Sequence, residues 1–170
     1  MDQTLKVLND LEKKHVIERY AIGGAIAAIF YMEPILTYDL DIFVLLPESP
    51  TGLIVLSPVY EYLRRKGYKE HKEHVLIEGV PVQFIPAYNE LVKEAVEEAV
   101  ERRYKRVGTR VLRAEHLLAI MLQTGRPKDR ARMTHLLEEA KINADFLRQI
   151  LKRHGLQAKW QEFRRRFCEK

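Results

Sequence analysis

Residues 20–46 read YAIGGAIAAIFYMEPILTYDLDIFVLL, and the order of apolar, small and turn-forming residues in this stretch decides the fold. A short apolar run with strand character ends at the glycine pair 23–24. Residues 25–32 are small and apolar, which predicts a buried helix that Pro34 ends. Residues 38–46 have the β-branched and aromatic content of a buried strand. The stretch therefore predicts a strand, a glycine turn, a helix and a second strand.

Asp39 and Asp41 place two carboxylates one residue apart inside the second predicted strand. Asp is depleted in strands, and an unpaired carboxylate taken out of water is costly. Alternate residues of a strand project to the same face, so these two acids would raise each other's pKa and could share one cation. Mg²⁺ is usually held by one or two carboxylates together with substrate phosphates. The pair therefore predicts a metal site.

Gly23 and Gly24 complete a pattern with these acids, because 14 residues separate Gly24 from Asp39. Glycines between a strand and a helix let backbone N–H groups approach a phosphate, and a helix N-terminus favours negative charge. Taken singly, a glycine pair is more often a turn, and two alternating acids are more often solvated at a strand edge. Together and in this order, they predict a site for a nucleoside triphosphate and its metal ion.

The composition is typical of a globular chain. The 170 residues are enough for one domain, or for one domain with a small appendage, and a hydrophobic content of 46% supports a core. The longest apolar runs fall short of the roughly 20 residues that a membrane span needs. The first residues, MDQTLKVLNDLEKK, contain no secretory apolar stretch, and the single Cys168 excludes an intramolecular disulfide. These features predict a cytoplasmic protein without a membrane partner.

Charge is distributed unevenly along the chain. Residues 1–100 carry 10 Lys and Arg against 16 Asp and Glu, whereas residues 101–170 carry 19 against 8. Residues 102–113, RRYKRVGTRVLR, hold six of these basic side chains. Such asymmetry favours a surface for phosphates or nucleic acid, but it is equally typical of helices with solvated basic faces. Both interpretations remain open from the sequence.

The rest of the chain divides into a mixed first half and a helical second half. Residues 73–87, EHVLIEGVPVQFIPA, predict a hairpin around Glu78-Gly79. Apolar spacing and end signals predict further helices, at residues 3–15, 53–66, 88–101, 114–124, 127–140, 143–154 and 157–168. His71 and His74 in HKEH lack the further ligands that zinc needs, so this segment is interpreted as a solvated loop.

Residues 20–46 resemble the opening of the nucleotidyltransferase superfamily, whose best-known member is DNA polymerase beta. Within it, the likeness is closest to bacterial minimal nucleotidyltransferases and to nucleotidyltransferase toxins of the abortive-infection type. The core resemblance covers residues 17–88, and a looser one covers residues 113–140, RAEHLLAIMLQTGRPKDRARMTHLLEEA. It implies an α/β (α+β) fold with a small mixed sheet flanked by helices. The core would span residues 1–109, and a C-terminal helical bundle would span residues 110–170.

The resemblance also implies roles for individual residues. Gly23 and Gly24 would contact the triphosphate, and Asp39 and Asp41 would be the catalytic metal ligands for Mg²⁺ or Mn²⁺. Thr37 matches a small hydroxyl residue often found before the acids. Lys128 and Asp129 match a basic motif in the helical segment, where Lys128 or Arg130 would reach phosphate.

Two residues depart from the family pattern. The family usually supplies a third carboxylate from a later strand, and the matching residue here is Gln83, which offers an amide oxygen but no charge. This leaves a one-metal site, a site that uses another acid such as Glu78, or a site that binds nucleotide without turnover. Met121 stands where relatives often carry a lysine that contacts the triphosphate.

The expected activity is the metal-dependent transfer of a nucleoside monophosphate from an NTP to a hydroxyl. The acceptor would be a protein side chain, a tRNA end or a small molecule, and the sequence assigns no general base. A toxin role with an antitoxin partner follows from the resemblance alone. The alternative is a binding module of the same fold that has lost catalysis with its third acid, and that binds nucleotide, RNA or a partner protein.

Overall fold

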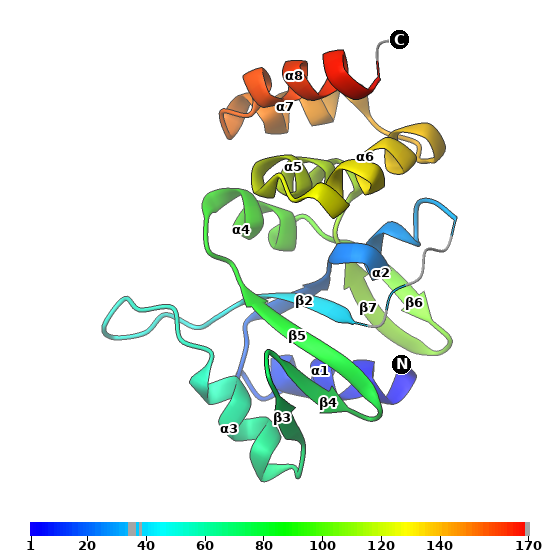
Figure 1. Ribbon diagram of the computed structural model, residues 1–170. Helices are drawn as coiled ribbons and strands as arrows, with labels where there is room; N and C mark the ends of the chain where they lie inside the picture. Colours follow the sequence, from blue (N-terminus) through cyan, green and yellow to red (C-terminus); the bar gives the residue numbers. More distant parts are fainter. Residues whose placement is uncertain (34–36, 38, 169–170) are drawn as a thin grey trace.

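The computed structural model describes residues 1–33, 37 and 39–168. Within these residues, seven strands form one mixed sheet, and helices cover it and stack beyond it (Figure 1). The strands are β1 (Arg19–Ile22), β2 (Leu40–Leu45), β3 (Lys69–His71), β4 (His74–Ile77), β5 (Val80–Pro86), β6 (Val100–Tyr104) and β7 (Val107–Val111). The helices are α1 (Asp2–Lys13), α2 (Gly24–Ala28), α3 (Ser57–Arg65), α4 (Glu90–Glu97), α5 (Ala114–Thr124), α6 (Pro127–Glu139), α7 (Ala144–Arg153) and α8 (Gln157–Phe167).

The sheet order is β3-β4-β5-β2-β1-β7-β6, which places β2 at the centre. β2 runs antiparallel to β1 and parallel to β5, and β1 runs parallel to β7. The hairpin predicted around Glu78-Gly79 is confirmed, because Ile77 pairs with Val80. β6 and β7 form a second hairpin, which contains residues 102–111 of the basic segment and turns after Tyr104. The sheet confirms the predicted α/β class with a small mixed sheet.

Helices pack on both faces of this sheet. α1 contacts β1 and β7, and its Leu5, Leu8 and Leu11 are fully buried at the spacing expected of an amphipathic helix. α4 contacts β1 and β2 and begins at Asn89, whose side chain accepts a hydrogen bond from the Val92 N–H. α5 packs on α2 and α4, and α6, α7 and α8 pack in turn on α5. Figure 1 shows these helices stacked on the side of the sheet away from α1.

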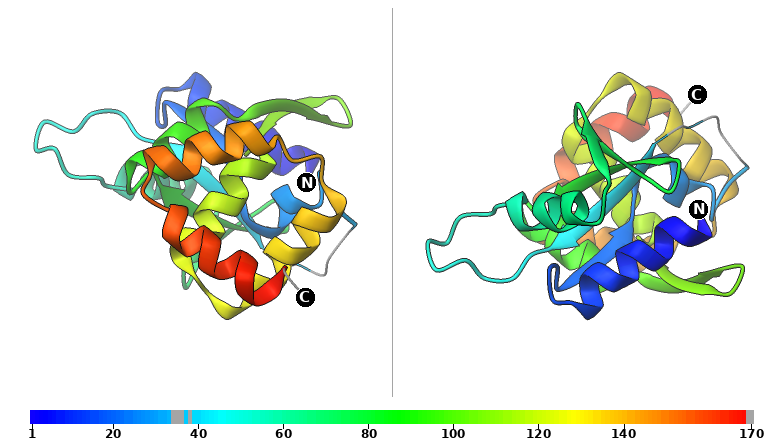
Figure 2. Two further views of the ribbon diagram at one scale, coloured as in Figure 1. Left: turned by 90° about the horizontal axis from the view of Figure 1, so that it is seen from above. Right: turned by 90° about the horizontal axis from the view of Figure 1, so that it is seen from below.

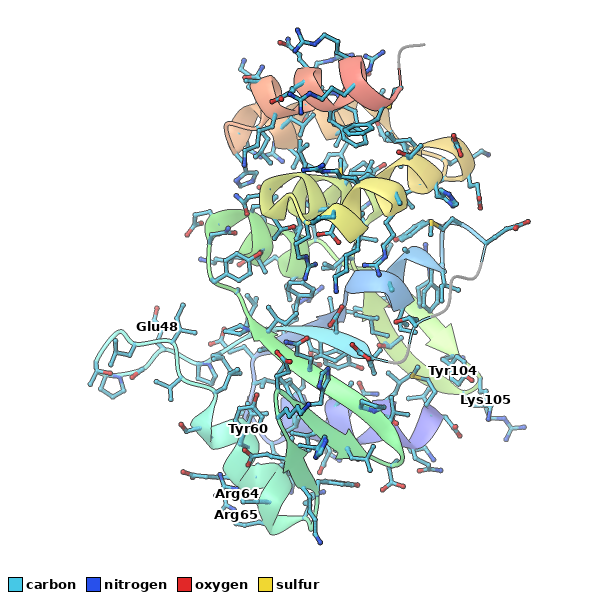
Figure 3. The ribbon with its side chains drawn as sticks, viewed as in Figure 1. Glu48, Tyr60, Arg64, Arg65, Tyr104 and Lys105 are labelled. Carbon is cyan, nitrogen blue, oxygen red and sulfur yellow. The ribbon has the colours of Figure 1, made fainter. Side chains whose placement is uncertain are left out.

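Three helices are shorter than their sequence patterns predicted. α4 spans Glu90–Glu97 instead of residues 88–101, because Val100 and Glu101 belong to β6. α2 ends at Ala28 instead of residue 32, and α3 begins at Ser57 instead of residue 53. Pro58 near the start of α3 suits the first helical turn but disfavours helix before it. Residues 46–56 form a loop that projects from the body of the protein, and Glu48 lies in this loop (Figures 2 and 3). Two predicted boundaries lie outside the described residues: the end of the first helix at Pro34 and the start of the second strand at Tyr38.

The predicted core boundary at residue 109 falls inside β7. Ile22 of β1 pairs with Val111 of β7, so that strand belongs to the central sheet. The helical half therefore begins at Ala114, after β7 has ended. None of the helices in the described ranges is long and apolar enough to cross a membrane.

Glu94 joins α4 to the helical half. Its carboxylate accepts hydrogen bonds from His116 of α5 at 3.1 Å, from Arg153 of α7 at 2.7 Å and from His154 at 2.8 Å. Burial alone would raise the pKa of Glu94, but the hydrogen bonds from Arg153 and the two histidines outweigh it and lower the pKa to about 2. The charged carboxylate therefore stabilises the folded chain.

Replacing Glu94 by glutamine is expected to lower the free energy of unfolding at neutral pH. Because the folded-state pKa is depressed, the stabilisation is fully present above the ordinary value of 4.5 and is lost as the pH falls towards about 2. The difference between wild type and Glu94→Gln should thus shrink over this range in denaturant unfolding. A difference that stays constant with pH would contradict this role of the Glu94 charge.

Candidate active site

Gly24 and Asp41 lie against each other where β1 turns into α2. The Gly23 N–H donates a hydrogen bond to the Asp41 carbonyl oxygen at 2.9 Å, which fixes the turn against β2. A Cβ added at Gly23 would overlap the Phe43 ring, and one added at Gly24 would overlap the Asp41 carboxylate. Gly24 also has φ +57°, a conformation that other residues rarely adopt. The turn therefore requires both glycines, and it holds backbone close to the acid.

Gln83 is the neighbour of Asp41 across the parallel β2–β5 pair. Register partners in a sheet share one face, so the Gln83 side chain lies beside that of Asp41. Asp39, two residues earlier, lies just before β2, and its side chain is 52% exposed. Gln83 thus stands where the resemblance calls for a third carboxylate, and it supplies an uncharged amide there.

The charged form of Asp41 is disfavoured by its surroundings. Burial raises the pKa of Asp41 above its usual value, and the Asp39 charge adds to this rise. Three basic side chains at or near the start of α6, those of Arg126, Arg132 and Lys128, partly offset it. A divalent cation between the carboxylates would remove the repulsion. Carboxylate and amide oxygens are ligands that Mg²⁺ accepts, so the residues present fit such an ion.

A cavity of about 360 Å³ opens beside Asp41, between the sheet and helices α5 and α6. This volume lies within the range of small-molecule sites. Its polar lining consists of Gly24, Asp41, Gln83, Tyr88, Thr124, Arg126, Asp129 and Arg132. Its apolar lining consists of Phe43, Ile85, Leu112, Leu117, Ile120 and Met121. Met121 therefore forms part of an apolar wall, so the cavity has one apolar side and one charged side.

Asp129 orients two arginines at the charged side. Its side chain is fully buried, and its carboxylate accepts a hydrogen bond from Arg126 Nε at 2.7 Å. Arg132 Nη1 lies 3.6 Å from the other carboxylate oxygen, and Thr124 donates its hydroxyl at 3.2 Å. A buried carboxylate with these partners holds both guanidinium groups over the cavity.

Replacing Asp129 by asparagine is expected to lower the free energy of unfolding by about 2 kcal/mol, because hydrogen bonds to a buried charge are lost. The matched control is Asp145→Asn, since Asp145 pairs with Arg148 at the same helical spacing but both side chains are more than 70% exposed. That change should cost less than about 0.5 kcal/mol. Equal costs in chemical denaturation would show that the burial of Asp129 contributes nothing.

The other residues predicted for the site occupy different places. Lys128 is exposed and does not line the cavity, although its charge acts on Asp41. Arg130 lies on the opposite side of α6, in a depression that it shares with residues of α8. Thr37 is partly buried outside the cavity lining. Glu78 lies at the β4–β5 turn and accepts a hydrogen bond from the Tyr68 hydroxyl at 2.7 Å.

Sequence reasoning missed three residues of this region. Arg126 and Arg132 lie on either side of the predicted Lys128, and their signal is the spacing of three residues to Asp129. His74 does not lie in a solvated loop, as the HKEH segment suggested. It is the first residue of β4, with its side chain 24% exposed, and its Nε2 lies 3.6 Å from Asp39 Oδ2.

The basic side chains of residues 102–113 do not line the cavity, although Leu112 of this segment does. Tyr104 and Lys105 mark the tip of the β6–β7 hairpin, at the edge of the protein (Figure 3). Lys105 pairs with Asp2 at 3.4 Å, and Arg110 pairs with Glu12 at 2.6 Å. Part of its positive charge is thus balanced by acids of α1, which favours the interpretation as a solvated basic face.

The described residues contain one group of three acidic and histidine side chains close enough to share a metal ion, and it lies away from Asp41. Ligand atoms of Glu94, Glu98 and His116 come within 4.8 Å of one another. Glu94 already accepts hydrogen bonds from Arg153 and His154, so a cation would have to displace two basic groups. This group is better explained as a link between helices.

Two solved structures align with almost the whole chain. An antigenic nucleotidyltransferase-like protein from Paracoccidioides brasiliensis matches with a TM-score of 0.53 and 12% identity, over 94% of this chain and 93% of that chain. The solution structure of the antibiotic-resistance factor ANT(2'')-Ia matches with a TM-score of 0.51 and 14% identity, over 98% of each chain. No family model and no curated protein sequence matches. The mixed sheet and these two alignments show that the chain has the nucleotidyltransferase fold.

Proposed function

We propose that this chain binds a nucleoside triphosphate with a divalent metal ion and transfers the nucleoside monophosphate to a hydroxyl acceptor. The observation that carries the proposal is the contact of Gly24 with Asp41 at the mouth of a cavity whose charged side holds Arg126 and Arg132. Backbone, carboxylates and arginines are the groups that a triphosphate and a metal ion would contact, which supports the proposal. The nucleotidyltransferase fold also supports the proposed activity.

Each part of the site has a separate task. Asp39 and Asp41 would hold Mg²⁺ or Mn²⁺, which neutralises charge on the phosphates and aligns the displacement. Gly23 and Gly24, without side chains, let the triphosphate approach the backbone. The two arginines at the cavity would bind phosphate oxygens, for which guanidinium groups are well suited. The apolar wall formed by α5 and the sheet would take the base and ribose.

The reaction forms one bond and breaks one. An acceptor oxygen bonds to the α-phosphorus, and the bond between that phosphorus and the oxygen leading to the β-phosphate breaks. Pyrophosphate leaves, and the proton of the acceptor hydroxyl passes to water. The acceptor is a protein side chain, a tRNA end or a small molecule.

Labelled nucleotides test this proposal directly. The protein is incubated with cell extract and with NTP labelled on either the α- or the γ-phosphorus. Label that enters an acceptor from the α-position, while γ-label leaves as pyrophosphate, is the expected result. Transfer of γ-label would indicate a kinase instead, and incorporation that persists in the Asp39→Ala/Asp41→Ala variant would come from a contaminant.

Gln83 supports a second candidate function. Among the described cavity-lining residues, the carboxylates are Asp41 and Asp129, and Asp129 is engaged with arginines. Glu78, the acid that sequence analysis named as a substitute, lies at a hairpin turn and bonds Tyr68. A binding module that holds nucleotide, RNA or a partner protein without turnover would show the same structure. Nucleotide binding without any α-label transfer, in extracts that support a known nucleotidyltransferase, would favour this candidate.

A toxin role rests on the resemblance to toxin-type nucleotidyltransferases. It requires that overproduction slows growth and that a cognate antitoxin relieves the effect. Asp39→Ala and Asp41→Ala should each restore growth when produced at the same level. Slow growth that survives both substitutions would rule out nucleotidyl transfer as its cause.

A further inference from the structure

A second depression lies among α5, α6 and α8, which stack together at the end of the protein away from α1 (Figure 1). Its volume is about 210 Å³. Its apolar lining consists of Met121, Leu122, Met133, Phe163 and Phe167. Its polar lining consists of Gly125, Arg130, Lys159, Glu162 and Arg166. The depression therefore combines aromatic rings with three cations and one carboxylate.

The positive charge of this lining is only partly neutralised. Arg166 pairs with Glu162 at 2.7 Å, but the two side chains are 59% and 50% exposed, so water weakens their attraction. Lys159 Nζ donates to the Gln123 carbonyl oxygen at 3.3 Å, and this acceptor has no net charge. Arg130 is exposed and forms no ion pair within residues 1–33, 37 and 39–168. The depression therefore favours an anionic ligand.

An aromatic ring is exposed beside these cations. Phe167, near the end of α8, is 45% exposed. Its ring packs on one side against Phe163, with the ring centroids 5.3 Å apart, and Phe163 itself is buried. Phe163 thus holds α8 on the other helices, whereas Phe167 keeps part of its ring open to a ligand. Nucleobases stack on such rings whatever their identity, because every base has a π-face.

The depression adjoins the cavity that holds Asp41. Met121 lines both hollows. At the turn between α5 and α6, Gly125 lines the depression and the next residue, Arg126, lines the cavity. The Arg126 side chain is 55% exposed, and Lys128 is also exposed. Positive charge therefore continues from the depression, across this turn, to the cavity.

We propose that this depression binds a single-stranded nucleic acid, with one base stacked on Phe167 and backbone phosphates held by the cations of the lining. A single strand supplies both the repeated negative charge and the open base faces that these side chains would contact, whereas an acidic peptide supplies only the charge. A strand bound there would have its end beside the cavity, and a terminal hydroxyl would become the acceptor of the nucleotide. Only this last step rests on the proposed function.

Fluorescence anisotropy with a labelled oligonucleotide of about ten residues, in an RNA and a DNA form, tests the binding site. Wild type should bind both forms, and binding should weaken as salt rises because counterions are released from the phosphates. Phe167→Ala should lower the affinity about tenfold through the loss of stacking. Lys159→Gln should lower it about three- to fivefold and make the salt dependence shallower.

Tyr104→Ala and Lys105→Gln are the matched controls. These residues place an exposed aromatic ring and a cation together at the tip of the β6–β7 hairpin, outside the depression (Figure 3). Their replacement should leave the affinity unchanged. Thermal unfolding shows that each variant is folded, and Phe167→Leu serves if the alanine variant is not.

Equal affinity of wild type, Phe167→Ala and Lys159→Gln would overturn the assignment of this depression. Displacement of the oligonucleotide by poly-glutamate at the same concentration of negative charge would overturn it as well, because stacking would then contribute nothing. Titration with NTP and Mg²⁺ keeps this failure distinct from that of the proposed function, since both α8 variants should bind nucleotide as wild type does.

Transfer of α-label to the RNA tests the acceptor step. Label should enter an RNA with free terminal hydroxyls and should not enter one that ends in a 2′,3′-dideoxynucleotide. Oligonucleotide binding without such transfer, by a protein that labels another acceptor, would overturn the acceptor step and leave both the depression and the proposed function intact.

Discussion

Replacing Asp41 by asparagine is expected to lower nucleotidyl transfer by about a thousandfold or more, because the metal ion contributes several kcal/mol to the transition state and loses a charged ligand. The free protein should nevertheless be as stable as wild type or more stable. Burial and the Asp39 charge raise the pKa of Asp41, so its ionised form opposes folding at neutral pH when no cation is present. Transfer assays and thermal unfolding with and without metal measure both effects.

The combination of lost activity and kept stability separates this prediction from simple unfolding. Asp2→Asn on α1 removes a carboxylate far from the cavity, at its ion pair with Lys105, and should leave transfer unchanged. Metal should raise the unfolding temperature of wild type and of Asp2→Asn but not of Asp41→Asn. An Asp41→Asn protein that still transfers nucleotide at the wild-type rate would remove Asp41 from the catalytic site.

Replacing Gly24 by alanine is expected to reduce nucleotide affinity or transfer by about a hundredfold, the cost of displacing a reacting group by about 1 Å. The new Cβ would overlap the Asp41 carboxylate and turn it away from the metal position. It would also strain the backbone, because Gly24 has φ +57°. The strain should lower the free energy of unfolding by about 1–2 kcal/mol.

Gly79→Ala separates the effect of backbone strain from the effect of overlap with Asp41. Gly79 has φ +79° at the β4–β5 turn, and a Cβ added there meets nothing within 4 Å. This variant should show the loss of stability without the loss of nucleotide binding. If both variants lost stability equally and both bound nucleotide normally, the contact between Gly24 and Asp41 would have no part in the site.

Local sequence patterns were sufficient to predict the central unit of the fold. The glycine pair at 23–24, the alternating acids and the apolar run after them are signals within fewer than 30 residues. The hairpin at Glu78-Gly79, the Asn89 cap and the helix end at Gly125 follow from residues that act on their own backbone. The placement of Gln83 beside Asp41 could also be anticipated, because the resemblance supplied the register that periodicity alone does not.

The parts that local patterns could not predict depend on contacts between distant residues. His74 reaches Asp39 because β4 pairs with β5 and β5 pairs with β2, an order of strands that no short segment encodes. Arg126 and Arg132 are oriented by the buried Asp129, while the neighbouring Arg130 points to α8. The basic side chains of residues 102–113 do not line the cavity, because β6 and β7 form one edge of the sheet (Figure 1). The charge pattern of the sequence thus indicated which residue types contribute to the site, but not which individual residues lie close together in the fold.

Isothermal titration with ATP, GTP, CTP and UTP, each with and without Mg²⁺ or Mn²⁺, tests the metal–nucleotide site most directly. The Asp39→Asn/Asp41→Asn variant is titrated in parallel, and circular dichroism shows that both proteins are folded. Wild type should bind at least one of these nucleotides only when the metal is present, and the double variant should lose that binding. Absence of binding to every nucleotide by folded wild type, or binding that is equally strong without metal and in the double variant, would contradict the proposed site.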